Sequence, residues 1–399
     1  MRAAHRRGVL AFLLAMALIA ALIAGCGTDD TSGTTDDETT KEPIKIGAIV
    51  SLSGTYAGLG EPEKNVIEME VKKINDAGGI NGREVEVIIE DDGTDETKAV
   101  SAATKLIDQD KVIAIMGSTG TGATMAIRGE IERAGIPQVS MAGSTVIIDP
   151  VNKWVFATPW PNKIVVPFEF DYMKSQGITN IGLISDTGGF GKDGKAVIEA
   201  MASEFGITIA SNQTFNPGDT DMTAQLTNIK NSGAQAVVMW SAGKEASIVA
   251  QNMKQLGLTI PLIGSHGNAR MEFIQGAGDA AEGFRFGAGK ILIPEAYGTD
   301  TEAYKVATNF IDEYTAEWDS APSTFAGHAY DALYLITEAA KRVEGDLTAA
   351  ALRDEIEKTD GFVGIGGTFK FSPEDHNGLT EDDLVMYEVK SGAWTLVEK

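Results

Sequence analysis

The stretch VIAIMGSTGTGAT, residues 112–124, decides the fold. Its first five residues are apolar, which predicts a buried strand, and the helix-like segment 125–133 follows. A strand that passes into a helix through small hydroxylated residues presents free backbone amides and hydroxyl donors at one place. The stretch therefore predicts an α/β fold with an anion site, interpreted as a ligand carboxylate site, in the turn 117–124.

A second hydroxylated turn supports this interpretation. The turn 117–124 contains GxxxxG but lacks the Lys-Ser/Thr pair of a phosphate-binding loop, and an ordinary glycine-rich connection stays open as the alternative. The sequence SMAGS, residues 140–144, ends the next expected strand, 137–140. Because the carboxyl ends of parallel strands meet at one edge of a sheet, we expect both turns to contribute to one site.

Strands and helices alternate along most of the chain, which predicts parallel sheets covered on both faces. The Pro-rich segment TPWP, 158–161, separates two such series and predicts two lobes. The first series is expected at 44–50, 84–90, 112–116 and 137–140 for strands and at 61–75, 96–108 and 121–134 for helices. The second is expected at 181–184, 208–215, 236–240 and 261–263 for strands and at 162–175, 192–204, 222–231 and 244–256 for helices.

The N-terminus predicts export. A basic head precedes an apolar run, 9–24, which is shorter than the about 20 residues of a membrane-spanning helix. The sequence LIAGC, 22–26, resembles a bacterial lipobox, which implies cleavage before Cys26 and lipid attachment to it. The single cysteine excludes an internal disulfide. The acidic, Thr-rich segment 26–42 is expected to be a disordered tether.

Composition excludes several classes of partner. A hydrophobic content of 43% indicates a globular chain, and a formal charge of −24 argues against nucleic acid and against anionic lipid as an electrostatic partner. No HExxH, CxxC or GxSxG motif is present, so neither a metal site nor a catalytic nucleophile is expected. We expect no cofactor, no enzyme activity and a monomer.

Two further features keep alternatives open. The glycines of GGFGKDG, 188–194, imitate nucleotide-binding motifs, but Ala196 stands where a magnesium-binding hydroxyl belongs. This segment is either a plain entry into a helix or a loop that places Phe190 at a cleft. His266 follows an apolar strand and is either a surface residue or a site residue. His328 and His376 are expected to be structural or solvated.

Four stretches together resemble the type I periplasmic-binding-protein superfamily, specifically the leucine/isoleucine/valine-binding protein family of ABC importers. They are IKIGA (44–48), INDAGGINGR (74–83), GIP (135–137) and GAGDAAEG (276–283). The resemblance covers about 44–390. It implies two Rossmann-like lobes joined by three crossovers, 43–158 plus 288–370 and 159–287 plus 371–399, after the signal peptide 1–25.

The same resemblance implies the ligand-binding residues. The family holds the ligand α-carboxylate with positions that correspond to Thr121, Ser144 and the Ala142 amide. An expected aromatic of the first loop corresponds to Leu59, a second-lobe tyrosine to Phe190, and the glutamate that pairs with the ligand ammonium to His266. The remaining candidate ligand-binding residues are Gly120, Trp240 and Phe325.

Replacement of that glutamate by His266 favours a ligand without an amine, because an unpaired ammonium in a closed cleft is costly. We therefore expect a small carboxylate with an apolar or aromatic body. A branched-chain or other hydrophobic amino acid remains the alternative, with Asp186 as a possible counter-ion. The expected function is a lipid-anchored, extracytoplasmic substrate-binding protein that delivers its ligand to an ABC permease with its ATPase subunits. A ligand-sensing receptor component is the alternative class.

Overall fold

The computed structural model describes residues 41–397. The expected signal peptide, Cys26 and all but the last two residues of the expected tether lie outside this range.

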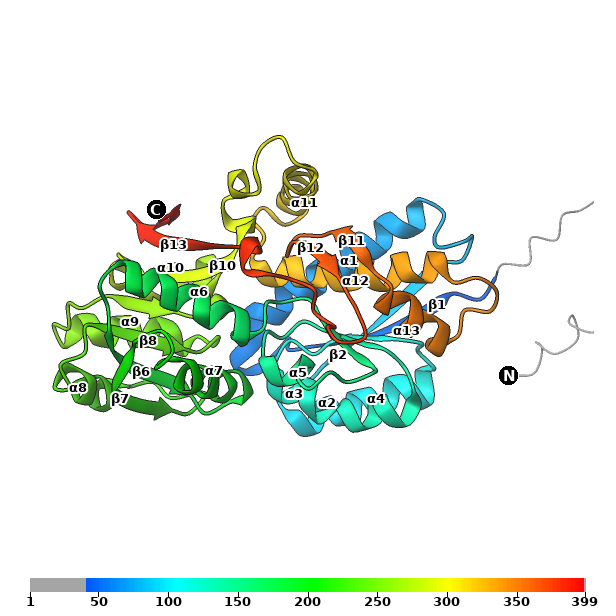
Figure 1. The fold of residues 1–399 in the computed structure, drawn as a ribbon. Helices are drawn as coiled ribbons and strands as arrows, with labels where there is room; N and C mark the ends of the chain where they lie inside the picture. The colour runs from blue at the N-terminus through cyan, green and yellow to red at the C-terminus, as the bar shows by residue number, and fades with distance from the viewer. Residues whose placement is uncertain (1–40, 398–399) are drawn as a thin grey trace, which may run out of the picture. The chain divides into compact units, whose positions relative to one another are not determined.

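The first half of the described chain builds a parallel five-stranded sheet in the order β2-β1-β3-β4-β5. Helices α2, α3 and α4 lie along one side of this sheet, and α1 lies along the other (Figure 1). The strands are β1 (Ile44–Val50), β2 (Val85–Asp91), β3 (Ile115–Gly117), β4 (Gln138–Ser140) and β5 (Val155–Ala157). The helices are α1 (Ala57–Asp76), α2 (Glu96–Lys105), α3 (Thr121–Ala126), α4 (Arg128–Ala134) and α5 (Thr145–Ile148), with short turns η1 (Gly54–Tyr56) and η2 (Leu106–Asp110).

A second, seven-stranded sheet has the order β14-β13-β10-β9-β8-β6-β7, in which only β13 runs antiparallel to its two neighbours, β10 and β14. Helix α7 contacts α6, while α9 contacts both α8 and α10. The strands are β6 (Asn180–Asp186), β7 (Thr208–Phe215), β8 (Ala236–Trp240), β9 (Leu262–Gly264), β10 (Arg285–Gly289), β13 (Leu384–Lys390) and β14 (Ala393–Leu396). The helices are α6 (Asn162–Ser175), α7 (Gly189–Met201), α8 (Thr223–Lys230), α9 (Glu245–Gln255) and α10 (Met271–Ala277), with turns η3 (His266–Asn268) and η4 (Gly278–Ala281).

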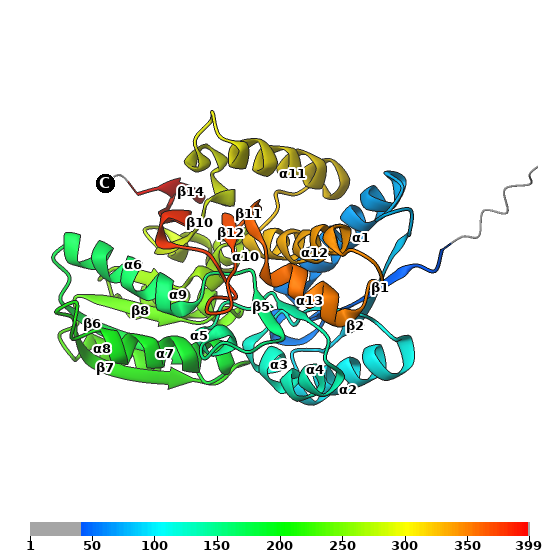
Figure 2. The same cartoon turned by 45° about the vertical axis from the view of Figure 1, so that its right-hand side comes forward.

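The chain then returns to the first sheet. Helix α12 packs beside α1 and contacts β3 and β4, as both ribbon views show (Figure 2). This part comprises α11 (Glu302–Trp318), α12 (Thr324–Arg342), α13 (Ala349–Glu357), the hairpin β11 (Asp360–Val363) and β12 (Thr368–Lys370), and turns η5 (Lys290–Leu292), η6 (Pro294–Tyr297) and η7 (Glu381–Asp383). The chain thus passes between the two sheets three times, after β5, after β10 and before β13.

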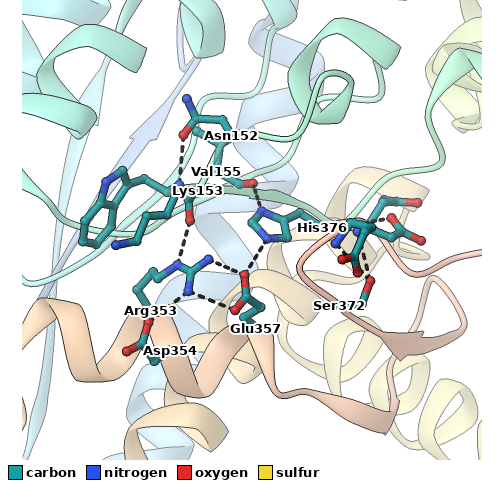
Figure 3. Close-up of polar contacts among 12 residues, drawn as sticks. Asn152, Lys153, Val155, Arg353, Asp354, Glu357, Ser372 and His376 are labelled. Atoms are coloured by element: carbon teal, nitrogen blue, oxygen red, sulfur yellow. Dashed lines mark hydrogen bonds and ion pairs between the residues drawn. The ribbon is translucent and has the colours of Figure 1, made fainter.

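The third passage lies against the first in a buried polar joint (Figure 3). The Asn377 side-chain amide donates to the Ala157 carbonyl (3.0 Å). The His376 ring faces the Val155 carbonyl through Nδ1 (2.9 Å) and the Glu357 carboxylate through Nε2 (3.1 Å). His376 is only 1% exposed, so of the two expected roles, structural or solvated, the structure supports the first.

The structure differs from the predicted elements mainly at short strands and helix ends. The helix expected at 121–134 is interrupted at Ile127, between α3 and α4. Strands β5, β10 and β14 were not expected, because segments of three to five residues carry too little periodicity to be distinguished from loops. Helix α1 begins four residues before the expected start and includes Pro62.

Candidate functional site

A small cavity lies where the two sheets face each other, and most of its wall comes from loops that follow the carboxyl ends of strands. Its volume is about 30 Å³, which is room for one or two water molecules, so any larger ligand requires the walls to move apart. The lining residues are Tyr56, Leu59, Thr119, Gly120, Thr121, Met141, Ala142, Gly143, Pro159, Phe190, Ala242, His266, Gly267, Phe325 and His328.

The turn 117–124 forms one wall, as the sequence predicts, and a buried polar network fixes its position. The Thr119 hydroxyl bonds to the Glu63 carboxyl group and accepts the Ser51 amide N–H (2.9 Å). The Ser118 hydroxyl donates to Asp92. Burial raises the pKa of Glu63 well above its usual range, with the Asp92 charge acting in the same direction and the Thr119 bond opposing. Burial therefore favours the neutral form of the carboxyl group that supports this wall.

Two hydroxyls of the expected carboxylate clamp, defined as Thr121, Ser144 and Ala142, come together in the structure. Thr121 Oγ1 and Ser144 Oγ are 2.8 Å apart, and both side chains are buried. Thr121 lines the cavity, while Ser144 lies directly behind it. The pair thus joins the turn after β3 to the turn after β4, as the parallel sheet predicts.

The third member of the clamp is arranged differently from the expectation. Ala142 lines the cavity, but its amide N–H donates to Ser140 Oγ (3.1 Å) instead of pointing to a free site. Ser140 belongs to β4 and is fully buried, and its hydroxyl also bonds to Thr124 Oγ1 (3.1 Å). In this structure, therefore, the Ala142 amide supports the turn rather than offering a free donor.

Apolar and aromatic side chains form the rest of the wall. Leu59, Phe325 and Phe190 line the cavity. The other expected residues that line it are Gly120, Thr121, Ala142 and His266. Phe190 stands at the start of α7, so the segment 188–194 does place it at the cavity.

Trp240 does not line the cavity and is a correction to the expected site. It stacks behind Phe190 with ring centroids 6.3 Å apart, and its Nε1 donates to Asn162 Oδ1 (3.0 Å). A Cβ at Gly194 would lie 1.9 Å from the indole. Gly194 is therefore needed for close packing of α7 on Trp240. This packing explains the glycine without any role in nucleotide binding.

His266 lines the cavity and is only 6% exposed, so the surface interpretation of this residue is wrong. Its ring lies edge-on to Phe190, with centroids 5.2 Å apart. Burial lowers the pKa of His266 to about 4, against a smaller opposing effect of the Gly143 backbone. The imidazole is therefore neutral at physiological pH.

Among the lining residues that sequence reasoning missed are two with polar rings, His328 and Tyr56. His328, expected to be structural or solvated, is 4% exposed and lines the cavity. It follows Phe325 by three residues on α12, a spacing that puts both on one helix face and could have revealed it. Tyr56 also lines the cavity. It provides an aromatic side chain in the loop after β1, where the resemblance assigns the aromatic position to Leu59.

Asp186, the possible counter-ion, is not among the lining residues. It accepts the Gly188 amide N–H (2.7 Å) at the end of β6. Burial raises its pKa to about 6, although bonds from Gly188 and Ser241 oppose this. No Asp, Glu, Lys or Arg lines the cavity within the described residues, so the wall itself carries no charged side chain.

Two kinds of feature are missing from residues 41–397. None of the helices there is long and apolar enough to cross a membrane. No group of three or more His, Cys, Asp or Glu side chains in this range could hold a metal ion.

Comparison with known proteins shows the family. Residues 43–393 match the periplasmic binding protein family. The chain is 24% identical over 360 residues to a leucine-, isoleucine-, valine-, threonine- and alanine-binding protein of Pseudomonas aeruginosa, covering 87% of this chain and 90% of the relative. It is 24% identical over 364 residues to the Leu/Ile/Val-binding protein BraC3 of Rhizobium johnstonii, covering 88% and 92%.

Solved structures agree in fold. An extracellular ligand-binding receptor from Rhodopseudomonas palustris HaA2 has a TM-score of 0.84 at 27% identity, covering 89% of this chain and 99% of that one. The branched-chain amino acid transporter substrate-binding protein LivJ from Streptococcus pneumoniae, in complex with isoleucine, has a TM-score of 0.78 at 27% identity, covering 88% and 97%. The chain belongs to the periplasmic binding protein family, with the type I fold. This family is extracytoplasmic and consists of substrate-binding proteins.

Proposed function

We propose that this chain is the extracytoplasmic substrate-binding lipoprotein of an ABC importer of the branched-chain amino acid type. Its ligand is a small carboxylate with an apolar or aromatic body, bound in the cavity and delivered unchanged to the permease. Cys26 anchors the monomer to the membrane through lipid, and the permease and ATPase subunits are its partners.

The observation that carries the ligand class is the uncharged wall of the cavity. The Thr121 hydroxyl lines the cavity and can donate to a carboxylate, supported from behind by Ser144, and Leu59, Phe190 and Phe325 suit an apolar or aromatic body. A ligand ammonium would be desolvated in this cavity without an acidic side chain in the wall, which is unfavourable. A ligand without an amine avoids that cost.

The proposed lobes are 43–158 plus 288–370 and 159–287 plus 371–399. The packing of α12 on α1 supports the first assignment, and the pairing of β13 with β10 supports the second. Ligand that touches both lobes stabilises the closed form by its higher affinity for it, and the permease would recognise that form.

A branched-chain amino acid is the second candidate, because the curated relatives and LivJ are named for such ligands. Binding of leucine would require Asp186 to approach the cavity as a counter-ion. Its backbone bond to Gly188 would have to rearrange or be shared for this to happen.

Calorimetric titration of the purified full-length protein in detergent tests the ligand class. Leucine, phenylalanine, benzoate and 4-methyl-2-oxopentanoate are added separately. We expect binding of at least one of the two acids that lack an amine and weaker binding of both amino acids. Tight leucine binding with none for the acids would overturn the preference, and mass spectrometry of a co-purified ligand would identify the natural compound.

A further inference from the structure

Two histidines share the cavity wall although they come from distant parts of the chain. His266 lies in η3, directly after β9 of the seven-stranded sheet, and His328 lies in the first turns of α12. They are 6% and 4% exposed, and both line the cavity. His266 also acts electrostatically on His328, which places the two rings in one neighbourhood.

Although the Gly143 backbone lies near His266 and opposes the fall in its pKa, three of the four ring nitrogens have no well-formed hydrogen bond within residues 41–397. This holds for Nδ1 and Nε2 of His266 and for Nδ1 of His328, all of them buried atoms. His376 shows the contrast, because both of its nitrogens face oxygen acceptors (Figure 3). Buried polar atoms in native proteins are nearly always satisfied, so atoms left open in a cavity wall point to a group that enters the cavity.

Aromatic neighbours hold both rings without satisfying them. His266 lies against Phe190, at 5.2 Å, and Trp240, at 6.2 Å between ring centroids. His328 lies edge-on to Trp160, at 5.7 Å, and to Phe325, at 5.9 Å. The rings are thus fixed by packing.

The chemistry of the pair is that of neutral imidazoles. Burial lowers the pKa of His266 to about 4 and that of His328 to about 3. A neutral imidazole offers one N–H donor and one acceptor nitrogen. A hydroxyl group can use both kinds of atom, and a carbonyl oxygen can accept both N–H groups.

The position of the pair relative to the clamp restricts the ligand further. A Cβ built on Gly143 would lie 2.5 Å from Nε2 of His266, so this nitrogen is next to the chain between Ala142 and Ser144. An oxygen bound by His266 is therefore close to a carboxylate held by Thr121 and Ser144. In a cavity of about 30 Å³ that both Thr121 and His266 line, the ligand oxygen nearest to a bound carboxylate is the one on the adjacent carbon.

We propose that His266 and His328 form an imidazole pair that binds an uncharged hydroxyl or carbonyl oxygen at position 2 of the ligand, which makes the ligand class 2-hydroxy or 2-oxo acids. This rests on the proposed carboxylate-binding function and narrows it. His328 then sets specificity, because a site with open hydrogen-bonding groups discriminates against an analogue that lacks the matching oxygen.

Two matched ligand series test the proposal by calorimetry on the purified full-length protein. The aliphatic series is 4-methyl-2-oxopentanoate, 2-hydroxy-4-methylpentanoate, 4-methylpentanoate and leucine. The aromatic series is phenylpyruvate, phenyllactate, 3-phenylpropanoate and phenylalanine. We expect an oxo or hydroxy acid to bind at least about tenfold more tightly than the acid without that oxygen in the same series.

Variants separate the pair from the clamp. His328→Phe should remove the preference for the oxygenated acid while the plain acid keeps its affinity within about twofold, and His266→Phe serves the same purpose if the first variant does not fold. His376→Gln is the control, because this histidine lies outside the cavity, and it should keep the preference. Nitrogen chemical shifts of the two cavity histidines should change when the oxygenated acid is added and not when the plain acid is.

The outcomes are distinguishable. Equal affinities for oxygenated and plain acids, or an unchanged preference in folded His328→Phe and His266→Phe, would overturn the imidazole pair and leave carboxylate binding intact. Binding of leucine or phenylalanine alone would overturn the proposed ligand class and the pair together. Absence of binding throughout both series would also overturn the pair.

Discussion

At the scale of single residues, the clamp depends on hydroxyls whose hydrogens are free to turn. The bond between Thr121 Oγ1 and Ser144 Oγ, at 2.8 Å, uses only one of the two hydroxyl hydrogens. The other hydrogen is available to a ligand oxygen. The pair of Thr121 and Ser144 is therefore assembled before binding, and reorientation of a hydroxyl costs little.

Replacement of Thr121 by valine tests the clamp. Thr121→Val keeps the shape and removes the donor, so carboxylate binding should weaken by about 1–3 kcal/mol in a calorimetric titration. Thr124→Val is the matched control, because Thr124 bonds to Ser140 and does not line the cavity. An unchanged dissociation constant in Thr121→Val would show that another residue holds the carboxylate.

Glu63 predicts a dependence of stability on pH. Its pKa is raised in the folded state by burial, so its contribution to stability is full below the unfolded pKa of about 4.3 and is lost as pH rises towards the folded pKa. Glu63→Gln cannot ionise and should show a smaller loss of unfolding free energy between pH 5 and pH 9. Glu68→Gln, at an exposed position of the same helix, should follow the wild type. Parallel curves for all three proteins would contradict a raised pKa of Glu63 in the folded state.

At the scale of elements, a residue of α7, which packs near the seven-stranded sheet, forms hydrogen bonds with the first turn of α5, which lies between strands β4 and β5 of the five-stranded sheet. The Asp193 carboxylate accepts the amide N–H groups of Thr145 (2.8 Å) and Val146 (3.3 Å) and the side-chain amide of Asn162 (2.6 Å). Asn162 in turn accepts from Trp240. One carboxylate thus connects the layer behind the cavity wall to the turn that carries Ser144.

Asp193→Ala should weaken this connection. It leaves two backbone amides without their acceptor, so we expect a lower melting temperature and ligand affinity reduced by about 1–3 kcal/mol. Asp279→Asn, whose side chain is 95% exposed, should have no effect on either measurement. Wild-type ligand affinity in Asp193→Ala would mean that the contact between Asp193 and α5 does not stabilise the conformation that binds ligand.

Glu357, in the joint between the third passage and β5, should affect stability with the opposite pH dependence to Glu63. Burial raises the pKa of Glu357, but bonds from Arg353 and His376 outweigh it and lower the net value. Its contribution to stability is therefore present above the unfolded pKa of about 4.3 and is lost as pH falls through the folded pKa. Figure 3 shows Arg353 and His376 on either side of this carboxylate.

Glu357→Gln should lower the unfolding free energy at pH 7, and its difference from the wild type should shrink in denaturant titrations below about pH 4. Glu338→Gln is a suitable control, because Glu338 is partly exposed and pairs with exposed Lys341. If the unfolding free energies of Glu357→Gln and the wild type differ by the same amount at every pH, the effect comes from packing of the side chain and not from its charge.

At the scale of the whole described chain, the close approach of two backbones accompanies the small cavity. A Cβ at Gly189 would lie 2.8 Å from the Gly122 amide nitrogen and 3.1 Å from Thr121 Cβ. Gly189 begins α7 and Gly122 lies in α3, so this contact joins the two sheets beside the clamp. A methyl group here would hold the walls apart.

Gly189→Ala should therefore reduce ligand affinity while leaving the fold intact. Small-angle scattering should show a smaller contraction on ligand addition than for the wild type. Gly129→Ala, on α4 with no atom near the added methyl group, should keep wild-type affinity and gain up to about 1 kcal/mol of stability from helix propensity. Full affinity and full contraction in Gly189→Ala would exclude this contact from closure.

The sequence by itself determined the α/β class, the two series of elements and the two hydroxylated turns that meet beside the cavity. These depend on local periodicity and on the rule that parallel strands end at one edge, and neither requires knowledge of distant contacts. The sequence also brought Phe190 and His266 to attention, through short segments that follow apolar strands.

Only the tertiary structure decided which side chains line the cavity and in what charge state. Trp240 lies behind the wall, while His328 and Tyr56 lie in it, because helix–helix and sheet–sheet packing sets these positions. The neutral state of His266 likewise follows from burial by residues far away in the chain. Desolvation is a property of the folded surroundings, so no local pattern in the sequence could have predicted it.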